Sequence, residues 1–209
     1  TNTLALLDSY EIGMRPLMFI THSMGGLLVK QMLRHAQDFG TPRWEVIVEQ
    51  TKGIVFLSTP HSGSDLANWA KYINDCILGI PRVGVSVEEL KANHDRLREL
   101  NLVYRNHRQL RHIPMEVYCE KLKTSGFLVV NETSADPGIP GVIPVPMDCD
   151  HISICRPQNQ GDQIYRRVKR FIKENLKTPL PLIELTDRES SLEPIELENQ
   201  QEPNIKKKI

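Results

Sequence analysis

The chain has 209 residues, and its 26 Lys and Arg balance its 26 Asp and Glu, so the formal net charge is zero. That balance gives no support to nucleic acid as the main partner, because phosphate binding favours a basic surface. The composition, 40% hydrophobic and 25% charged, is that of an ordinary globular protein, and no apolar run is long enough to cross a bilayer.

The chain begins with a short helix and a short strand. Residues 4–12 can form a helix with Leu4 and Leu7 on one side, and Gly13 ends it. Residues 16–20 are an apolar run of the kind that forms a strand buried on both faces. We therefore expect the first buried strand of the fold before residue 21.

A tight turn and a longer helix follow this strand. Residues 21–26 are short or polar, and residues 27–36 predict a helix with Leu28, Met32 and Ala36 on its buried stripe. A strand, a turn and a helix in this order make half of a parallel α/β unit.

The same alternation continues along the chain. Four more segments are predicted as strands or shorter extended pieces: residues 53–58, 115–119, 127–130 and 142–145. Helical spacing marks residues 65–113, and residues 164–172 predict a closing amphipathic helix. The sequence therefore predicts an α/β fold with a doubly wound, mainly parallel sheet, over residues 1–177.

The last 32 residues, 178–209, have a different composition. They hold six Glu and one Asp against Arg188 and three Lys, a net of −3, together with four Pro. We expect a disordered acidic tail or linker. Its scattered aliphatic residues could instead form a short segment that binds a protein partner: Ile183, Leu185, Leu192, Ile195 and Leu197.

The four cysteines bear on metals and on the cellular compartment. They stand at positions 76, 119, 149 and 155, with no C-x-x-C spacing. Neither a zinc site nor a disulfide framework is expected, and the sequence predicts no metal or cofactor. Such cysteine use favours a reducing compartment, and a cytoplasmic or membrane-peripheral location is expected.

Ser23 lies in the strand–turn–helix context that a nucleophile elbow requires. Gly25 is expected to avoid a clash with the strand, and Gly26 to let the helix pack closely. The backbone N–H of Met24 would be one donor of an oxyanion hole. Thr21 stands where the G-x-S-x-G pattern has its first glycine, which weakens the motif taken alone.

A catalytic serine of this type needs a histidine later in the chain. Of the seven histidines, His151 follows the last predicted strand and precedes the closing helix, so it is the candidate base. The alternative is a loop histidine bonded to Asp148 or Asp150. His22 is adjacent to Ser23 and is expected to be a packing or turn residue.

Three carboxylates are candidates for the acid that orients His151. Glu120 ends the predicted strand 115–119 and fits the expected order of serine, acid and histidine. Glu132 and Asp136, in the segment after residue 130, are the competitors. Glu120 is favoured, Glu132 is the alternate acid, and an exposed strand-end carboxylate is the simpler interpretation of Glu120.

Together these motifs resemble one group of α/β-hydrolases. Residues 16–30, 53–64 and 150–155 are similar, in the same order, to the serine esterase group that includes serine active site-containing proteins and GPI inositol-deacylase-like lipases. The resemblance runs from about residue 15 to residue 176. Members also carry earlier strands and a loop that supplies a second oxyanion donor. No such segment precedes residue 16 here, so the hydrolase fold is expected to lack its first strands.

The resemblance implies hydrolysis or transfer of an acyl group from an ester, often of a lipid. It implies Ser23 as nucleophile and His151 as general base, and it supports Glu120 as the acid. The segment 59–64 is implied to shape a loop near the site. A second hypothesis is a non-catalytic regulatory or interaction module, which could be the front domain of a larger signalling protein.

Overall fold

Four parallel strands pair side by side in the computed structural model. The structure describes residues 2–62, 72 and 87–177. For residues 87–94 and 177 it describes the backbone alone. In the described residues the sheet order is β1–β2–β3–β4. The strands are β1 (Leu17–His22), β2 (Thr51–Leu57), β3 (Met115–Glu120) and β4 (Val145–Met147). This confirms the predicted α/β class. The predicted tail, 178–209, and much of the predicted helical stretch lie outside the described residues.

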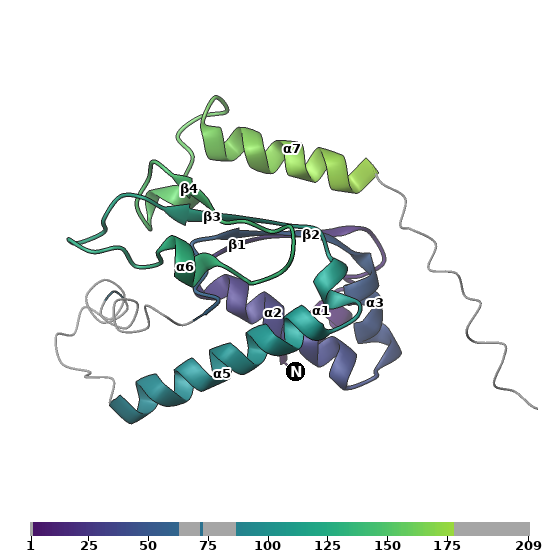
Figure 1. The fold of residues 1–209 in the computed structure, drawn as a ribbon. Coiled ribbons are helices and arrows are strands. Elements are labelled where there is room, and N and C mark those ends of the chain that lie inside the picture. The colour runs from purple at the N-terminus through teal and green to yellow at the C-terminus, as the bar shows by residue number, and fades with distance from the viewer. Residues whose placement is uncertain (1, 63–71, 73–86, 178–209) are drawn as a thin grey trace, which may run out of the picture. The chain divides into compact units, whose positions relative to one another are not determined.

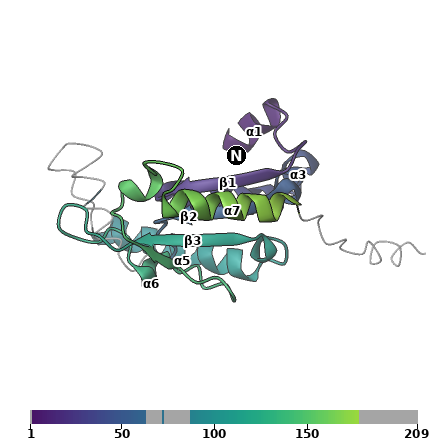
Figure 2. The ribbon, with the colours of Figure 1, turned by 90° about the horizontal axis from the view of Figure 1, so that it is seen from above.

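Helices cover both faces of the sheet (Figures 1 and 2). One face carries α7 (Gln163–Lys177), and the other carries α2 (Met24–Asp38), α3 (Pro42–Gln50) and α5 (Val87–Asn106). Four shorter elements complete the described part: α1 (Asn2–Ser9), η2 (Leu110–His112), α6 (Glu132–Ala135) and η3 (Ser153–Cys155). None of the helices within the described ranges is long and apolar enough to cross a membrane.

Strand β2 is the centre of the core, as its continuous apolar sequence predicts. Ile54 and Phe56 are fully buried in the cluster that includes α2 and α3, whereas Val55 and Leu57 pack in a second cluster with α7. Alternate side chains of a strand point to opposite faces, so a strand covered on both faces needs apolar residues at every position. The predicted strand 53–58 is therefore confirmed.

Strand β1 differs from the prediction that it is buried on both faces. Ile20 is 51% exposed, and Thr21 is the buried residue of this strand. Among the described strands, β1 pairs with β2 alone and so lies at one edge of the sheet. An apolar strand at an edge keeps part of its side-chain surface in contact with solvent.

The buried face of α2 includes Met32 and Ala36 of the predicted stripe but not Leu28. Leu28 is 56% exposed, so its assignment to the core is wrong. Val29, Met32, Leu33 and Ala36 form the buried face. Residues three and four apart share a helix face, and a shift of one position moves that face by about 100°.

The segments after β3 also depart from expectation. Residues 127–130 form no strand, and β4 begins at Val145, where the predicted piece 142–145 ends. Helix α3 was not predicted, although Thr41 followed by Pro42 is a typical helix start. The predicted strand 115–119 and the closing helix are confirmed as β3 and α7.

Candidate active site

Ser23 forms a strained turn between β1 and α2. Its backbone has φ 52° and ψ −126°, a conformation that residues with side chains rarely adopt. The Ser23 N–H donates to the Leu57 carbonyl at 2.9 Å, and the Thr59 hydroxyl donates to the Ser23 carbonyl at 3.1 Å. These bonds fix the turn at the carboxyl ends of β1 and β2, as a nucleophile elbow requires.

The close approach at this turn occurs at Gly26, and the prediction for Gly25 is wrong. A Cβ at Gly25 would have its nearest neighbour, the Thr21 Cβ, at 4.0 Å, an ordinary contact. A Cβ at Gly26 would overlap Thr59 Oγ1 and lie 2.8 Å from Phe56 Cδ1. The space around Gly25 also explains how Thr21 fits at a position where the motif has glycine.

We expect Gly26→Ala to destabilise the protein while Gly25→Ala does not. Overpacking against Thr59 and Phe56 should lower the free energy of unfolding by about 1–3 kcal/mol. Gly25→Ala should leave it unchanged or raise it by up to about 1 kcal/mol, because alanine favours helix. Urea denaturation of both variants measures the difference. Equal destabilisation of the two variants would contradict this packing.

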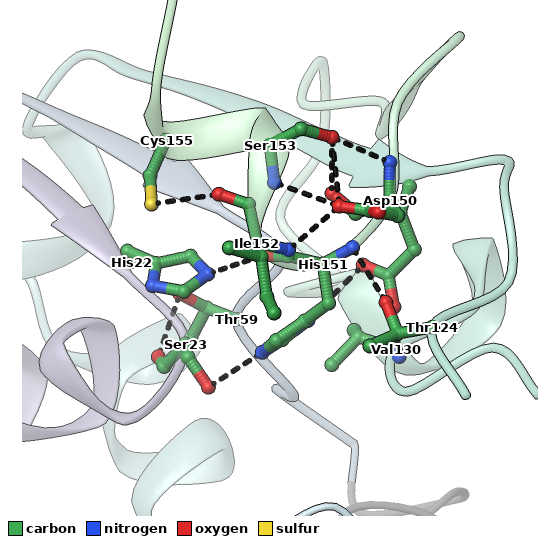
Figure 3. Close-up of polar contacts among 11 residues, drawn as sticks. His22, Ser23, Thr59, Thr124, Val130, Asp150, His151, Ile152, Ser153 and Cys155 are labelled. Atoms are coloured by element: carbon green, nitrogen blue, oxygen red, sulfur yellow. Dashed lines mark hydrogen bonds and ion pairs between the residues drawn. The ribbon is translucent and has the colours of Figure 1, made fainter. Parts of the chain in front are cut away.

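His151 is fully buried and faces Ser23 from the loop after β4 (Figure 3). Its Nε2 lies 3.0 Å from Ser23 Oγ, and its Nδ1 lies 3.4 Å from Glu120 Oε2. The three residues come from the carboxyl ends of different strands, which meet at one edge because the strands are parallel.

The two aspartates near His151 serve the loop rather than the imidazole. Asp148 pairs with Lys121 at 2.6 Å. The Asp150 carboxylate accepts hydrogen bonds from the N–H groups of Ile152 and Ser153, at 3.0 and 2.7 Å. The bonds of Asp150 close a tight turn around His151 (Figure 3), and the hydrogen bonds of both carboxylates go to partners other than its ring.

Glu120 ends β3 and is 2% exposed. Its Oε1 accepts the Val130 N–H at 2.6 Å, while Oε2 faces His151. Burial acts to raise the pKa of Glu120, but His151, the Ser58 hydroxyl and the Val130 N–H outweigh it and hold the pKa below its usual value. The carboxylate is therefore ionised at neutral pH.

The competing carboxylates lie elsewhere. Glu132 is exposed in the first turn of α6, and the Asp136 side chain accepts the Gly138 N–H at 2.7 Å. Of the three candidates, Glu120 is the one that the structure brings within hydrogen-bonding distance of His151.

Met24 is the first residue of α2, directly after Ser23. N–H groups in the first turn of a helix have no partner within that helix, and the positive end of the helix dipole lies there. The Met24 N–H therefore lies beside Ser23, at the end of the helix that stabilises a nearby negative charge.

Three residues contact His151 that were not predicted to do so. His22 Nε2 lies 2.7 Å from the His151 carbonyl oxygen, and Thr124 Oγ1 accepts the His151 N–H at 3.0 Å. Tyr72, 8% exposed, lies edge-on with its ring centroid 4.7 Å from that of His151. Only His22 carried a signal, its position next to Ser23.

A second buried polar cluster joins α2, α5 and the segment after β2. Lys30 is 1% exposed; its ammonium donates to Asn101 Oδ1 at 2.7 Å and lies 3.3 Å from His61 Nδ1. The His61 N–H donates to the Ser134 carbonyl at 2.7 Å. His61 follows Thr59, so this cluster holds the segment that contacts the Ser23 turn.

Cysteines and acidic side chains form no metal site in this part of the chain. Cys119, Cys149 and Cys155 are free thiols. Within residues 2–62, 72 and 87–177, no three His, Cys, Asp or Glu side chains group so that they could hold a metal ion.

The chain is homologous to the protein SERAC1 of vertebrates. It is 36% identical to the Homo sapiens protein over 179 residues. This aligned region covers 83% of this chain and 26% of SERAC1. For the Danio rerio protein the identity is 34% over 175 residues, covering 81% of this chain and 25% of the relative. The chain thus spans about a quarter of the length of these curated relatives. No family model matches it, and no solved structure matches it significantly.

Proposed function

We propose that this chain carries the catalytic residues of a serine hydrolase or acyltransferase that acts on a carboxylic ester, most directly a lipid ester. The observation that carries the proposal is the continuous contact from Ser23 Oγ through His151 to the buried Glu120, with Ser23 in a strained turn. The resemblance of residues 16–30, 53–64 and 150–155 to lipid-acting serine esterases supports the lipid substrate.

The acylation step follows from this geometry. Ser23 Oγ attacks the carbonyl carbon of the ester while His151 Nε2 takes the hydroxyl proton. Glu120 accepts the His151 Nδ1–H, which holds the required tautomer and stabilises the imidazolium. The Met24 N–H stabilises the negative oxygen of the tetrahedral intermediate. The bond to the leaving alcohol then breaks, and His151 gives that alcohol its proton.

Deacylation reverses these roles. Water, or a second alcohol, attacks the carbonyl carbon of the acyl-enzyme while His151 Nε2 takes its proton. The Ser23–acyl bond then breaks, His151 returns the proton to Ser23 Oγ, and the acyl group leaves as a carboxylic acid or a new ester. Water as acceptor makes the protein a hydrolase, and an alcohol makes it an acyltransferase. The separation of 3.4 Å between His151 Nδ1 and Glu120 Oε2 is expected to shorten in the complex with substrate.

We expect a fluorophosphonate probe to label the 209-residue protein at Ser23. Ser23→Ala should abolish the labelling, and Ser9→Ala, an exposed serine of α1, should leave it unchanged. Hydrolysis of p-nitrophenyl esters should follow the same pattern and favour long acyl chains. Wild-type protein that neither labels nor hydrolyses would instead support the non-catalytic module. Unchanged labelling of Ser23→Ala would refute the assignment of Ser23.

A further inference from the structure

His22 connects the serine turn to the histidine loop. It is the last residue of β1, covalently next to Ser23, and its ring reaches the loop after β4 (Figure 3). Its Nε2 lies 2.7 Å from the His151 carbonyl oxygen. A carbonyl oxygen can only accept a hydrogen bond, so Nε2 of His22 carries the proton. The two imidazole rings also pack together, with centroids 4.8 Å apart.

The backbone of His151 is held on both sides. Its carbonyl accepts from His22, and its N–H donates to Thr124 Oγ1 at 3.0 Å. Thr124 belongs to the loop after β3 and His22 to β1, so the two bonds tie His151 to two different segments. Bonds at both peptide groups fix the direction in which the His151 side chain leaves the backbone, and thereby the position of Nε2 near Ser23.

We propose that His22 is a positioning residue, which holds the histidine loop on the serine turn through its hydrogen bond to the His151 carbonyl. This inference rests on the proposed function and names a further part of the same site. Since His22 adjoins Ser23 in the chain, its bond sets the histidine loop relative to the nucleophile itself. Displacement of a reacting group by about 1 Å can lower a rate about 10²-fold.

The electrostatic surroundings of His22 keep its ring neutral. Burial is the main cause that lowers the pKa of His22, and nearby His151 and Arg156 lower it further, while the His151 carbonyl and Glu120 act in the opposite direction. A neutral His22 leaves His151 as the ring of the pair that receives the Ser23 proton. A second positive charge 4.8 Å away would oppose that transfer.

The test compares two substitutions of His22. His22→Phe keeps a ring but removes the donor, and His22→Gln keeps an N–H donor at similar reach. We expect His22→Phe to lower kcat for ester hydrolysis about 10- to 100-fold with KM little changed, and His22→Gln to recover most of that loss. Thr124→Val, which removes the bond on the other side, should act like His22→Phe. Equal kcat values for His22→Phe and His22→Gln would overturn the proposal.

A second measurement is independent of activity and of the folding of variants. Nitrogen-15 NMR of the wild-type protein near pH 7 should show His22 as the neutral tautomer with its proton on Nε2. A neutral His22 with its proton on Nδ1 could not donate to the His151 carbonyl and would overturn the proposal even in an active enzyme. If the NMR result is as expected but no ester is hydrolysed, the proposed function fails while the hydrogen bond stands.

Discussion

Glu120→Gln is expected to lower kcat for ester hydrolysis about 10³- to 10⁴-fold. The substitution keeps the shape of the side chain but removes the charge that faces His151 Nδ1 at 3.4 Å. A glutamine NH2 group turned toward Nδ1 would also favour the wrong tautomer, with a proton on Nε2 where the base must accept one. In the proposed mechanism, the loss of charge raises the free energy of the imidazolium, and the wrong tautomer leaves Nε2 unable to take the Ser23 proton.

The matched control is Glu132→Gln, since Glu132 is the alternate acid and is exposed on α6. It should hydrolyse the same ester at the wild-type rate. Thermal unfolding should show both variants folded, because the amide oxygen of the glutamine introduced by Glu120→Gln can still accept the Val130 N–H that Glu120 accepts at 2.6 Å. A large loss in Glu132→Gln together with wild-type activity in Glu120→Gln would reverse the assignment of the acid.

Local patterns in the sequence predicted the parts of the fold that local physics determines. The apolar run at residues 53–58 had to be a strand covered on both faces, and β2 is one. The turn at Ser23 was predicted because a strand, a small-residue turn and a helix follow one another directly. Each of these signals lies within about ten neighbouring residues.

Contacts between distant segments could not be predicted in the same way. The bond from His22 to His151 joins residues 129 apart, and the bond from His151 to Thr124 depends on the path of two loops. Periodicity gives no information about such paths. The choice among Glu120, Glu132 and Asp136 was open for the same reason, because it depends on which carboxylate the loop after β3 leaves beside His151.

Gly25 and Gly26 show a further limit of prediction from sequence. Sequence alone indicates that a turn contains small residues, but not which of them another segment approaches. Gly26 meets Thr59 and Phe56 of the next strand and its loop, whereas a Cβ at Gly25 would make only an ordinary contact with Thr21. The Leu28 prediction failed similarly, because the side of α2 that faces the sheet depends on how the turn directs the helix.

Lys30 should make the stability of the protein depend on pH. Burial lowers the pKa of Lys30 from 10.5 to about 7, and the charge of Arg105 adds to this effect. Its ammonium also faces His61, whose own pKa burial lowers well below 6.5, and lies 5.0 Å from the centroid of the Tyr104 ring. No salt bridge joins Lys30 to a carboxylate among the described residues.

The sign of the effect follows from proton binding. Between pH 7 and 10.5 the unfolded chain binds a proton at Lys30 that the folded chain releases, so stability should rise with pH in this window. Below pH 7 both states are charged, and the folded protein bears the full cost of the buried ammonium. The lowering of the Lys30 pKa from 10.5 to about 7 corresponds to a cost of roughly 5 kcal/mol.

Lys30→Met replaces the ammonium with an apolar side chain of similar length and should remove this pH dependence. We expect the free energy of unfolding of the wild type, measured relative to Lys30→Met by urea denaturation, to rise by about 2 kcal/mol between pH 7 and 9. Titrating groups common to both proteins contribute equally and cancel in this difference. The cost of leaving Asn101 without its donor in Lys30→Met does not change with pH, so it does not affect the rise. Lys123→Met, at an exposed lysine, is the control and should show no such rise. A difference that stays constant across this range would mean that Lys30 remains charged in the folded protein, held by Asn101 and His61 alone.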